Sequence, residues 1–275
     1  MVKIFAPAKI NLSLHVTGQR SDGYHMLDSL VVFVDVGDQI SAEAANETTL
    51  AVSGPFAQGV PTNGQNLVVK AAEASGLPMA LTLDKHLPPS SGIGGGSADA
   101  AATLRAAMRL GGAQMTKDHA VLLGADVPVC LASKSTRMQS IGDVLTPVTL
   151  PALHLVLVNP RVEVPTPDVF ARLERKDNPP MPKVLPRWPD SLAVVDWLGT
   201  QRNDLQDPAA KVAPEVAAVL VALALSPEVL LARMSGSGAT CFGVYPDRSS
   251  ADAAAAQLSH SNPWWWVKAA STLPA

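Results

Sequence analysis

Four glycines stand within five positions, Gly92 to Gly96, and an alanine-rich segment that favours a helix follows them directly. The first turn of a helix has backbone N–H groups without intrahelical partners and carries a partial positive charge. Residues that lack a Cβ atom let an oxyanion approach such backbone groups closely. A strand, a glycine loop and a helix in this order therefore predict a binding site for phosphate groups.

The segment at residues 90–96, which we call the glycine loop, matches neither of two common phosphate-binding patterns. It lacks the Gly-Lys-Ser/Thr ending of the Walker A loop, and Ser97 stands where the dinucleotide-binding fingerprint needs a glycine. The alternative interpretation is a flexible connector with a helix cap at Ser97. A connector does not need three consecutive glycines beside a serine pair, so we favour the phosphate site.

Two charged residues are candidates for chemistry on a phosphate group. Phosphoryl transfer to an alcohol requires a group that orients the hydroxyl and accepts its proton, and groups that stabilise charge on the phosphoryl. The carboxylate of Asp126, within GADVP, suits the first role. An ammonium beside that carboxylate would suit the second, and Lys9 lies on the polar side of an alternating strand, where a lone lysine is more commonly solvated. The spacing leaves alternatives open: a helix-capping or turn aspartate, and a solvated strand lysine.

Strands and helices are expected in mixed order around these candidates. Alternating apolar residues predict a strand at residues 9–16, a β-branched run predicts a buried strand at 29–36, and start and stop signals predict a helix at 66–76. Residues 175–190 contain five prolines and no apolar periodicity, which is typical of a loop. The other expected strands are 39–44, 48–53, 79–85, 137–141, 153–158, 229–235, 240–245 and 264–270, and the other expected helices are 97–110, 117–123, 191–198, 214–225 and 249–258.

The composition describes a globular chain long enough for two domains. Of its 275 residues 47% are apolar and 16% are charged, and the net charge is −3, which is a poor electrostatic match to nucleic acid. The sequence has no apolar run of about 18 residues and no signal-peptide pattern, so we expect a cytoplasmic protein without a membrane segment. Cys130 and Cys241 are expected to be buried thiols rather than a disulfide. We place a domain boundary near residue 150, giving domains 1–150 and 151–275.

Three segments, spread in order along the chain, carry a family resemblance. PAKINLSLHV at residues 7–16, LPPSSGIGGGSADAAA at 87–102 and RMSGSGATCFGV at 233–244 are similar to the N-terminal, central and C-terminal motifs of the GHMP kinases. The resemblance implies an α+β fold of two domains, with the active site in the cleft between them, and a reaction that uses ATP with Mg²⁺. No cluster of metal-ligating residues stands out in the sequence, so Mg²⁺ is expected to arrive with ATP.

Shorter segments indicate which branch of the family the chain resembles. RSDGYHML at residues 20–27, GADVP at 124–128 and PTPDVF at 165–170 are similar to the GHMP kinases that phosphorylate the 2-hydroxyl of a cytidine diphosphate-linked alcohol in the non-mevalonate route to isoprenoid precursors. The expected partner is this small-molecule substrate, with no nucleic acid and no membrane. A kinase for another acceptor, or a module that binds ATP without turnover, is the alternative. The presence of both Lys9 and Asp126 argues against the module.

The resemblance also implies roles for single residues. Lys9 and Asp126 fall on the positions of the family's catalytic lysine and aspartate. The glycine loop falls on the segment that wraps the phosphates of ATP. The residues expected around ATP are Pro88, Pro89, Ser90, Ser91, Gly92, Ile93, Gly94, Gly95, Gly96, Ser97 and Ala98.

Four further residues are expected to recognise the substrate. By resemblance, Asn11 and His25 bind the cytidine-containing molecule, and Tyr24 and Phe170 sandwich the cytosine ring. Packing at the rim or in the core is the alternative for these two rings. The serine- and glycine-rich segment at residues 235–240 is expected to let its backbone approach the nucleotide loop or the substrate, with a tight turn as the alternative.

Overall fold

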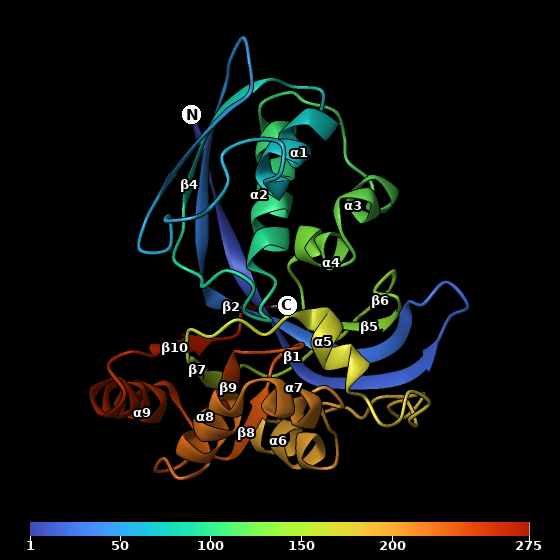
Figure 1. Cartoon of the computed structure of the whole chain (residues 1–275), viewed down its shortest axis with the longest axis vertical. Coiled ribbons are helices and arrows are strands. Elements are labelled where there is room, and N and C mark those ends of the chain that lie inside the picture. The colour runs from blue at the N-terminus through green and yellow to red at the C-terminus, as the bar shows by residue number, and fades with distance from the viewer. Residues whose placement is uncertain (275) are drawn as a thin grey trace. The chain divides into compact units, whose positions relative to one another are not determined.

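The computed structural model describes residues 1–274, and strands and helices are mixed along them, as the sequence predicts (Figure 1). The strands are β1 (Val2–Gln19), β2 (His25–Ala44), β3 (Thr49–Ser53), β4 (Met79–Asp84), β5 (Thr136–Ser140), β6 (Val144–Pro147), β7 (His154–Asn159), β8 (Leu231–Met234), β9 (Cys241–Tyr245) and β10 (Trp266–Ser271). The helices are α1 (Leu67–Ala74), α2 (Gly95–Arg109), α3 (Lys117–Leu123), α4 (Val127–Ala132), α5 (Thr166–Ala171), α6 (Ser191–Gly199), α7 (Gln206–Val212), α8 (Pro214–Ala224) and α9 (Arg248–Ser261).

The chain folds into two compact units, each made of several separate segments of sequence. Unit 1 comprises Met1–Lys9, Val36–Pro89 and Gly94–Ser133, and unit 2 comprises the other described residues. The long strands β1 and β2 contribute to both units, and residues 90–93 of the glycine loop belong to unit 2. The units therefore differ from the predicted division at residue 150, because a single cut in the sequence cannot separate strands that each belong to both.

Unit 1 contains a small sheet and the helix that follows the glycine loop. Residues 39–44 of β2 pair antiparallel with β4, and β4 pairs parallel with β3. α2 packs against α1 and α4 (Figure 1), and most of its buried side chains are alanines, which allow close approach between helices. The side-chain oxygen of Asn66 accepts a hydrogen bond from the Val68 N–H at 2.9 Å, so Asn66 caps the start of α1.

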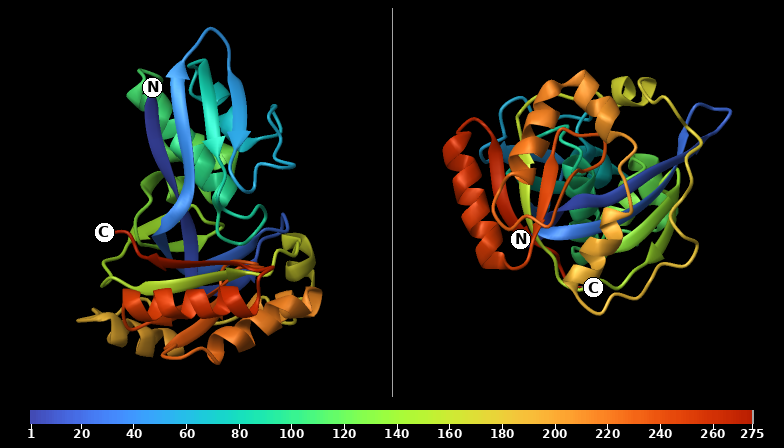
Figure 2. Two further views of the ribbon diagram at one scale, coloured as in Figure 1. Left: turned by 90° about the vertical axis from the view of Figure 1, so that its left-hand side faces the viewer. Right: turned by 90° about the horizontal axis from the view of Figure 1, so that it is seen from below.

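Unit 2 contains an antiparallel sheet with the strand order β10-β7-β9-β8. α9 lies along β7 and β10 (Figure 2), and α8 packs on β8 and β9. Apolar side chains from these strands and helices form the core of the unit, among them Val156, Val216, Leu223 and Tyr245. Separately, residues 27–31 of β2 pair with β5, and β5 pairs with β6.

The predicted strands and helices are mostly present, but several boundaries differ. The two strands predicted at residues 29–36 and 39–44 are one strand, β2, because Gly37 and Asp38 continue its extended backbone. β1 is longer than the predicted 9–16 at both ends. The short elements α4, α5, α7 and β6 are not among the predicted ones, since an apolar period is hard to recognise over four to seven residues.

Two ends of predicted elements shift for identifiable reasons. α2 begins at Gly95 rather than at Ser97, because Gly94 adopts a left-handed backbone that starts the helix two residues earlier. The C-terminal strand begins at Trp266, which is buried, whereas Trp264 precedes it and is 83% exposed. Residues 175–190 contain neither a strand nor a helix, which confirms the predicted loop.

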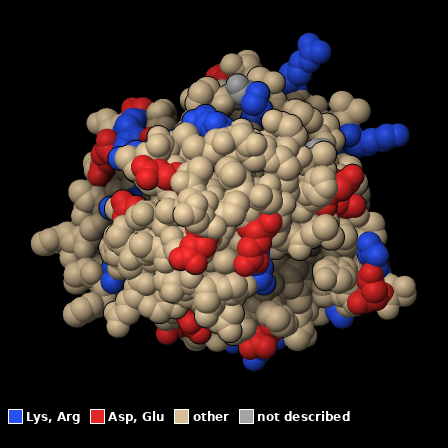
Figure 3. All heavy atoms as spheres, turned by 90° about the horizontal axis from the view of Figure 1, so that it is seen from above, with Lys and Arg blue, Asp and Glu red and all other residues tan. Residues whose placement is uncertain are grey.

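Burial and charge follow the composition. Cys130 and Cys241 are buried free thiols, as predicted, and burial raises the pKa of the Cys130 thiol to about 12. Within residues 1–274 no helix is both long and apolar enough to cross a membrane. The face drawn in Figure 3 carries acidic and basic side chains interspersed among wide neutral areas, in keeping with a net charge of −3.

Candidate active site

A buried lysine and a partly exposed aspartate form an ion pair in unit 1. Nζ of Lys9, on β1, lies 2.6 Å from Oδ2 of Asp126, which precedes α4. The side chain of Lys9 is 6% exposed and that of Asp126 is 34% exposed. The alternative of a solvated strand lysine is therefore wrong, and the carboxylate is the more accessible member of the pair.

Asp126 stands at the capping position of α4, yet its side chain does not cap the helix. No side-chain hydrogen bond joins Asp126 to the start of α4, and its main-chain oxygen accepts the Cys130 N–H at 3.1 Å. Pro128 in the first turn restricts the backbone that follows. The capping alternative is thus wrong, because the main chain holds Asp126 in place and its carboxylate contacts Lys9.

The start of α2 lies against the same lysine. Gly94 is the N-cap residue of α2 and has a left-handed backbone with φ 65°. A Cβ atom on Gly94 would lie 3.2 Å from Cβ and 3.4 Å from Cε of Lys9, so a glycine makes this close approach possible. The Ala98 N–H donates to Gly94 O at 2.8 Å. The amides of residues 95–97 precede that bond and have no partners within the helix, so this end of α2 has the backbone geometry that suits an anion.

A second lysine, which the sequence patterns do not single out, lies beside the glycine loop. Nζ of Lys85 lies 2.6 Å from Oδ2 of Asp38 and 2.6 Å from Oδ2 of Asp99, and all three residues are buried. A Cβ atom on Gly95 would lie 3.3 Å from this Nζ. Oδ1 of Asp38 also accepts the Leu87 N–H at 2.8 Å. The cluster therefore joins β2, the segment after β4 and the first turns of α2.

Burial sets the protonation balance of this cluster. Burial, and next the charge of Asp38, raises the pKa of Asp99 to about 7 against the opposing effect of Lys85. Burial acts to lower the pKa of Lys85, but Asp99 and then Asp38 outweigh it and raise that pKa. Oδ1 of Asp99 has no hydrogen-bond partner among the described residues, whereas Asp38 accepts backbone N–H groups. Asp99 is therefore the carboxyl group of the cluster that takes up a proton near neutral pH.

The part of the glycine loop that belongs to unit 2 contacts the serine- and glycine-rich segment at residues 235–240, which we call the C-terminal glycine motif. Oγ of Ser235 donates to Gly92 O at 3.0 Å, and the Thr240 N–H donates to Ser91 O at 3.1 Å. A Cβ atom on Gly92 would lie 2.6 Å from Ser235 O, which is closer than real Cβ contacts. The expectation that the backbone of the C-terminal motif approaches the glycine loop is thereby confirmed.

The residues expected to recognise the substrate belong to unit 2. Nδ2 of Asn11 donates to Oγ of Ser29 at 2.7 Å, and Oδ1 of Asn11 is buried without a hydrogen-bond partner in the described part of the chain. The ring of His25 stacks on that of Phe170, with centroids 4.4 Å apart and 21° between the planes. Tyr24 is 62% exposed. The structure thus brings His25 and Phe170 together and leaves the Tyr24 ring accessible, so core packing is wrong for Tyr24.

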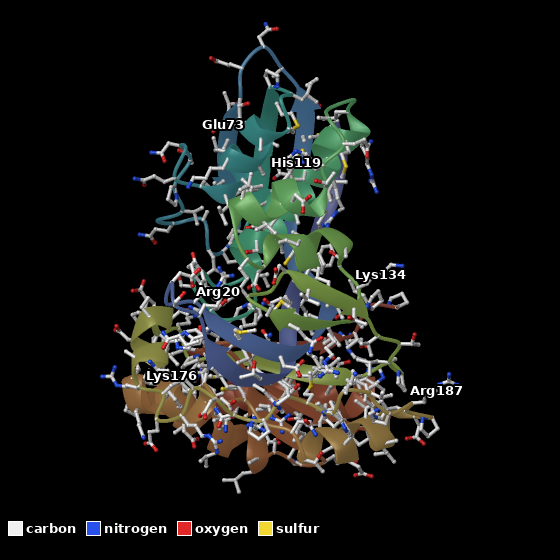
Figure 4. All side chains as sticks on the ribbon, turned by 90° about the vertical axis from the view of Figure 1, so that its right-hand side faces the viewer. Arg20, Glu73, His119, Lys134, Lys176 and Arg187 are labelled. Carbon is white, nitrogen blue, oxygen red and sulfur yellow. The ribbon has the colours of Figure 1, made fainter. Side chains whose placement is uncertain are left out.

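The environment of His25 favours a neutral imidazole. Burial, and secondly the charge of Lys176, lowers the pKa of His25. Lys176 and Arg20 lie on the same edge of unit 2 (Figure 4). Nε2 of His25 has no hydrogen-bond partner within residues 1–274. A neutral ring with an unpaired nitrogen can exchange a hydrogen bond with the polar edge of a nucleobase.

Sequence patterns miss the buried charges that support this site. Lys85 ends a predicted strand, Asp38 stands between the strands predicted at residues 29–36 and 39–44, and Asp99 stands among alanines of a predicted helix. Charged residues inside apolar segments are the signal that would have indicated them, because a buried charge needs a partner. Among the described residues no group of three or more His, Cys, Asp and Glu side chains is placed to hold a metal ion.

Known protein families match most of the chain. The model of the GHMP kinases N terminal domain matches residues 66–146, and that of the GHMP kinases C terminal region matches residues 193–263. The chain is 56% identical over 271 residues to the 4-diphosphocytidyl-2-C-methyl-D-erythritol kinase of Cereibacter sphaeroides, with 97% of this chain and 98% of the relative covered. It is also 56% identical over 265 residues to the same-named protein of Dinoroseobacter shibae, with 96% and 92% covered.

Solved structures agree with these relatives. A crystal structure of 4-(cytidine 5'-diphospho)-2C-methyl-D-erythritol kinase superposes with a TM-score of 0.81 and 30% identity, covering 100% of both chains. A homoserine kinase from Cytophaga hutchinsonii superposes with a TM-score of 0.64 and 18% identity, covering 99% of this chain and 94% of the other, and shows the fold alone. The predicted two-domain α+β fold is thereby confirmed.

Proposed function

The chain belongs to the GHMP kinases and, within them, to the 4-diphosphocytidyl-2-C-methyl-D-erythritol kinases, and we propose that its Lys9–Asp126 pair carries the phosphoryl transfer. Its activity is that of this family, the ATP-dependent phosphorylation of 4-diphosphocytidyl-2-C-methyl-D-erythritol in the non-mevalonate pathway to isoprenoid precursors. The observation that carries the residue assignment is the 2.6 Å contact between Lys9 Nζ and Asp126 Oδ2, beside Gly94.

Asp126 is the proton acceptor in this proposal. The 2-hydroxyl oxygen of the substrate forms a bond to the γ-phosphorus of ATP, the bond from that phosphorus to the β,γ-bridging oxygen breaks, and ADP leaves. The hydroxyl proton passes to the Asp126 carboxylate. Two features support this role: the carboxylate is partly exposed, and it makes no capping hydrogen bond to α4.

Lys9 orients Asp126 and stabilises negative charge on the transferring phosphoryl group. The Lys9 ammonium is largely shielded from water. In such an environment a charge interacts more strongly with its neighbours than it does in bulk solvent. The amides of residues 95–97 bind the phosphates of ATP at the start of α2. Mg²⁺ supplied with ATP would neutralise charge on the phosphates, and among the described residues we assign no side chain to it.

Unit 2 supplies recognition of the cytidine end of the substrate. Tyr24 and Phe170 offer ring faces to the base, Nε2 of His25 forms a hydrogen bond with the ligand, and Oδ1 of Asn11 accepts one from it. A buried polar atom without a partner is unfavourable until a ligand or water satisfies it, and both of these atoms are of that kind among the described residues. The charge of Lys176 near His25 suits a substrate that carries a diphosphate.

A panel of acceptors tests this function. Purified protein is incubated with ATP, Mg²⁺ and either 4-diphosphocytidyl-2-C-methyl-D-erythritol, mevalonate, homoserine or galactose. ADP release is followed, and the phosphorylated product is identified by mass spectrometry. We expect turnover with the cytidine-containing acceptor well above that with the other three, and its loss in Asp126→Asn. Faster turnover with another acceptor would reassign the substrate, and nucleotide binding without ADP release would identify a module that only binds ATP.

A further inference from the structure

We propose that Arg105 is a positioning residue for the Lys9–Asp126 pair, acting through the two backbone segments that carry the pair. This inference rests on the proposed function, because it takes Asp126 as the proton acceptor. Arg105 lies in the C-terminal half of α2, outside the glycine loop and outside the ion pair itself. Its hydrogen bonds connect α2 to both β1 and α4, all within unit 1.

The guanidinium of Arg105 donates to two different segments. Nη2 donates to Phe5 O on β1 at 3.0 Å. Nη1 donates to Cys130 O at 2.8 Å, to Ser133 Oγ at 3.2 Å and to Leu131 O at 3.4 Å, around the end of α4. A planar guanidinium holds several donors at fixed angles and can serve both segments at once, whereas an ammonium presents a single point of charge.

Helix α4 transmits this contact to Asp126. It has six residues, and Asp126 stands directly before the first of them. At a rise of 1.5 Å per residue the helix is about 9 Å long. Its last carbonyls lack intrahelical partners and carry partial negative charge, so the guanidinium of Arg105 stabilises that end. A shift of this short helix therefore moves the Asp126 carboxylate directly.

Strand β1 completes the arrangement. Phe5 and Lys9 lie four residues apart on β1, which corresponds to about 13 Å of strand. Lys9 contacts Asp126 at the beginning of α4, and Arg105 joins Phe5 to the end of α4. α4 is thus connected to β1 at both of its ends. The geometry of the ion pair at one end depends on the hydrogen bonds at the other.

Substitution of Arg105 is expected to leave the fold intact. Oγ of Ser133 donates to Cys130 O at 2.6 Å, so the end of α4 keeps one hydrogen-bond donor without the guanidinium. Burial lowers the pKa of Arg105, which remains a cation near neutral pH because the ordinary value is far higher. The predicted consequence is a small displacement of α4, not its unfolding.

Turnover by Arg105→Met is the first measurement. A displacement on the order of 1 Å at a reacting group costs up to roughly 10²-fold in rate, so we expect kcat to fall by roughly 10- to 100-fold. The dissociation constant of ATP should change little, because the amides that bind its phosphates lie at the other end of α2. Arg105→Lys keeps the charge and should recover only part of the rate. Arg109→Met, an exposed arginine on the same helix, is the matched control and should leave both quantities unchanged.

A double-variant cycle separates positioning from a general structural effect. If Arg105 acts through the position of the Lys9–Asp126 pair, adding Arg105→Met to Asp126→Asn should lower kcat by a smaller factor than Arg105→Met lowers it in the wild type. A further loss in the double variant equal to that of Arg105→Met would overturn the proposal, and so would a normal kcat in Arg105→Met. Full activity in Asp126→Asn alone would instead overturn the proposed function, so the two failures are distinguishable.

Discussion

Gly236 and Gly92 lie backbone against backbone in unit 2: a Cβ atom on Gly236 would stand 2.7 Å from Gly92 O. Both residues have a left-handed backbone, with φ of 57° at Gly236 and 74° at Gly92. The contact joins the C-terminal glycine motif to the glycine loop. Two separate constraints therefore favour glycine at each position: the left-handed backbone conformation, and the neighbouring backbone that occupies the space a side chain would need.

Replacement of Gly236 by alanine should destabilise the protein. The left-handed conformation alone costs alanine about 1–2 kcal/mol, and the 2.7 Å contact with Gly92 O adds to this because backbone cannot move aside cheaply. Urea denaturation should show a free energy of unfolding reduced by at least about 1 kcal/mol. Gly64→Ala is the matched control, since a Cβ atom there meets open space. Equal stability of the two variants would mean that the contact between the motifs is easily relieved.

Replacement of Asp126 by asparagine should remove the proton acceptor while preserving the shape of the site. A general base contributes typically 10²–10⁴-fold, so kcat should fall by roughly that factor. ATP should still bind, because its phosphates are assigned to the amides at the start of α2 and not to this carboxylate. Steady-state kinetics and a separate ATP titration measure the two effects. Asp143→Asn, at an exposed turn, makes the same chemical change as a control. Near-normal kcat with chemistry as the slow step would exclude Asp126 as the base.

The sequence predicts the parts of this site that are contiguous. Four glycines before an alanine-rich helix indicate a phosphate site through local backbone geometry alone, and the structure places the helix start beside Lys9. The hydrogen bonds of Arg105 could not be predicted in this way, because they join residues that lie far apart in the sequence. Periodicity reports which face of an element is apolar, but it does not report which distant carbonyls a partly buried guanidinium will contact. Such partners become visible only when the fold is known.

The buried cluster around Lys85 shows the same limit and gives a pH-dependent stability. The folded protein raises the pKa of Asp99 from 3.8 to about 7, so between these values the folded state binds a proton that the unfolded state has lost. Stability from this group must then fall as pH rises through that window. Asp99→Asn cannot ionise and should lack this contribution. The free energy of unfolding of the wild type, relative to Asp99→Asn, should therefore decrease from about pH 4 to about pH 7 and level off above.

Urea denaturation at several pH values measures this difference directly. Asp143→Asn makes the same chemical change at an exposed side chain and serves as the control. If the ammonium of Lys85 dominated instead, the pKa of Asp99 would be lowered. The wild type would then gain stability relative to Asp99→Asn as pH rises. A difference that is constant or rises with pH would therefore contradict the assignment of the proton to Asp99.

Replacement of Tyr24 by alanine should weaken binding of the cytidine-containing substrate selectively. Stacking of a base on an aromatic ring is worth about 1–3 kcal/mol, which corresponds to a loss of roughly 5- to 150-fold in affinity. The Tyr24 ring is 62% exposed, so its removal should disturb the fold little. Tyr24→Phe keeps the ring face and should bind nearly as well as the wild type. Titration of each variant with the substrate and, separately, with ATP measures the effect.

Phe170→Ala provides the comparison that decides which ring matters more. Phe170 stacks on His25 at 4.4 Å and also packs against the core of unit 2, so its loss removes a ring face and frees the His25 side chain. We expect a larger loss of substrate affinity than in Tyr24→Ala, again with ATP affinity little changed. Equal losses for both ligands would indicate a disturbed fold instead of a lost contact. An unchanged substrate affinity in Tyr24→Ala would leave His25 and Phe170 as the base-binding pair, with Tyr24 a surface ring.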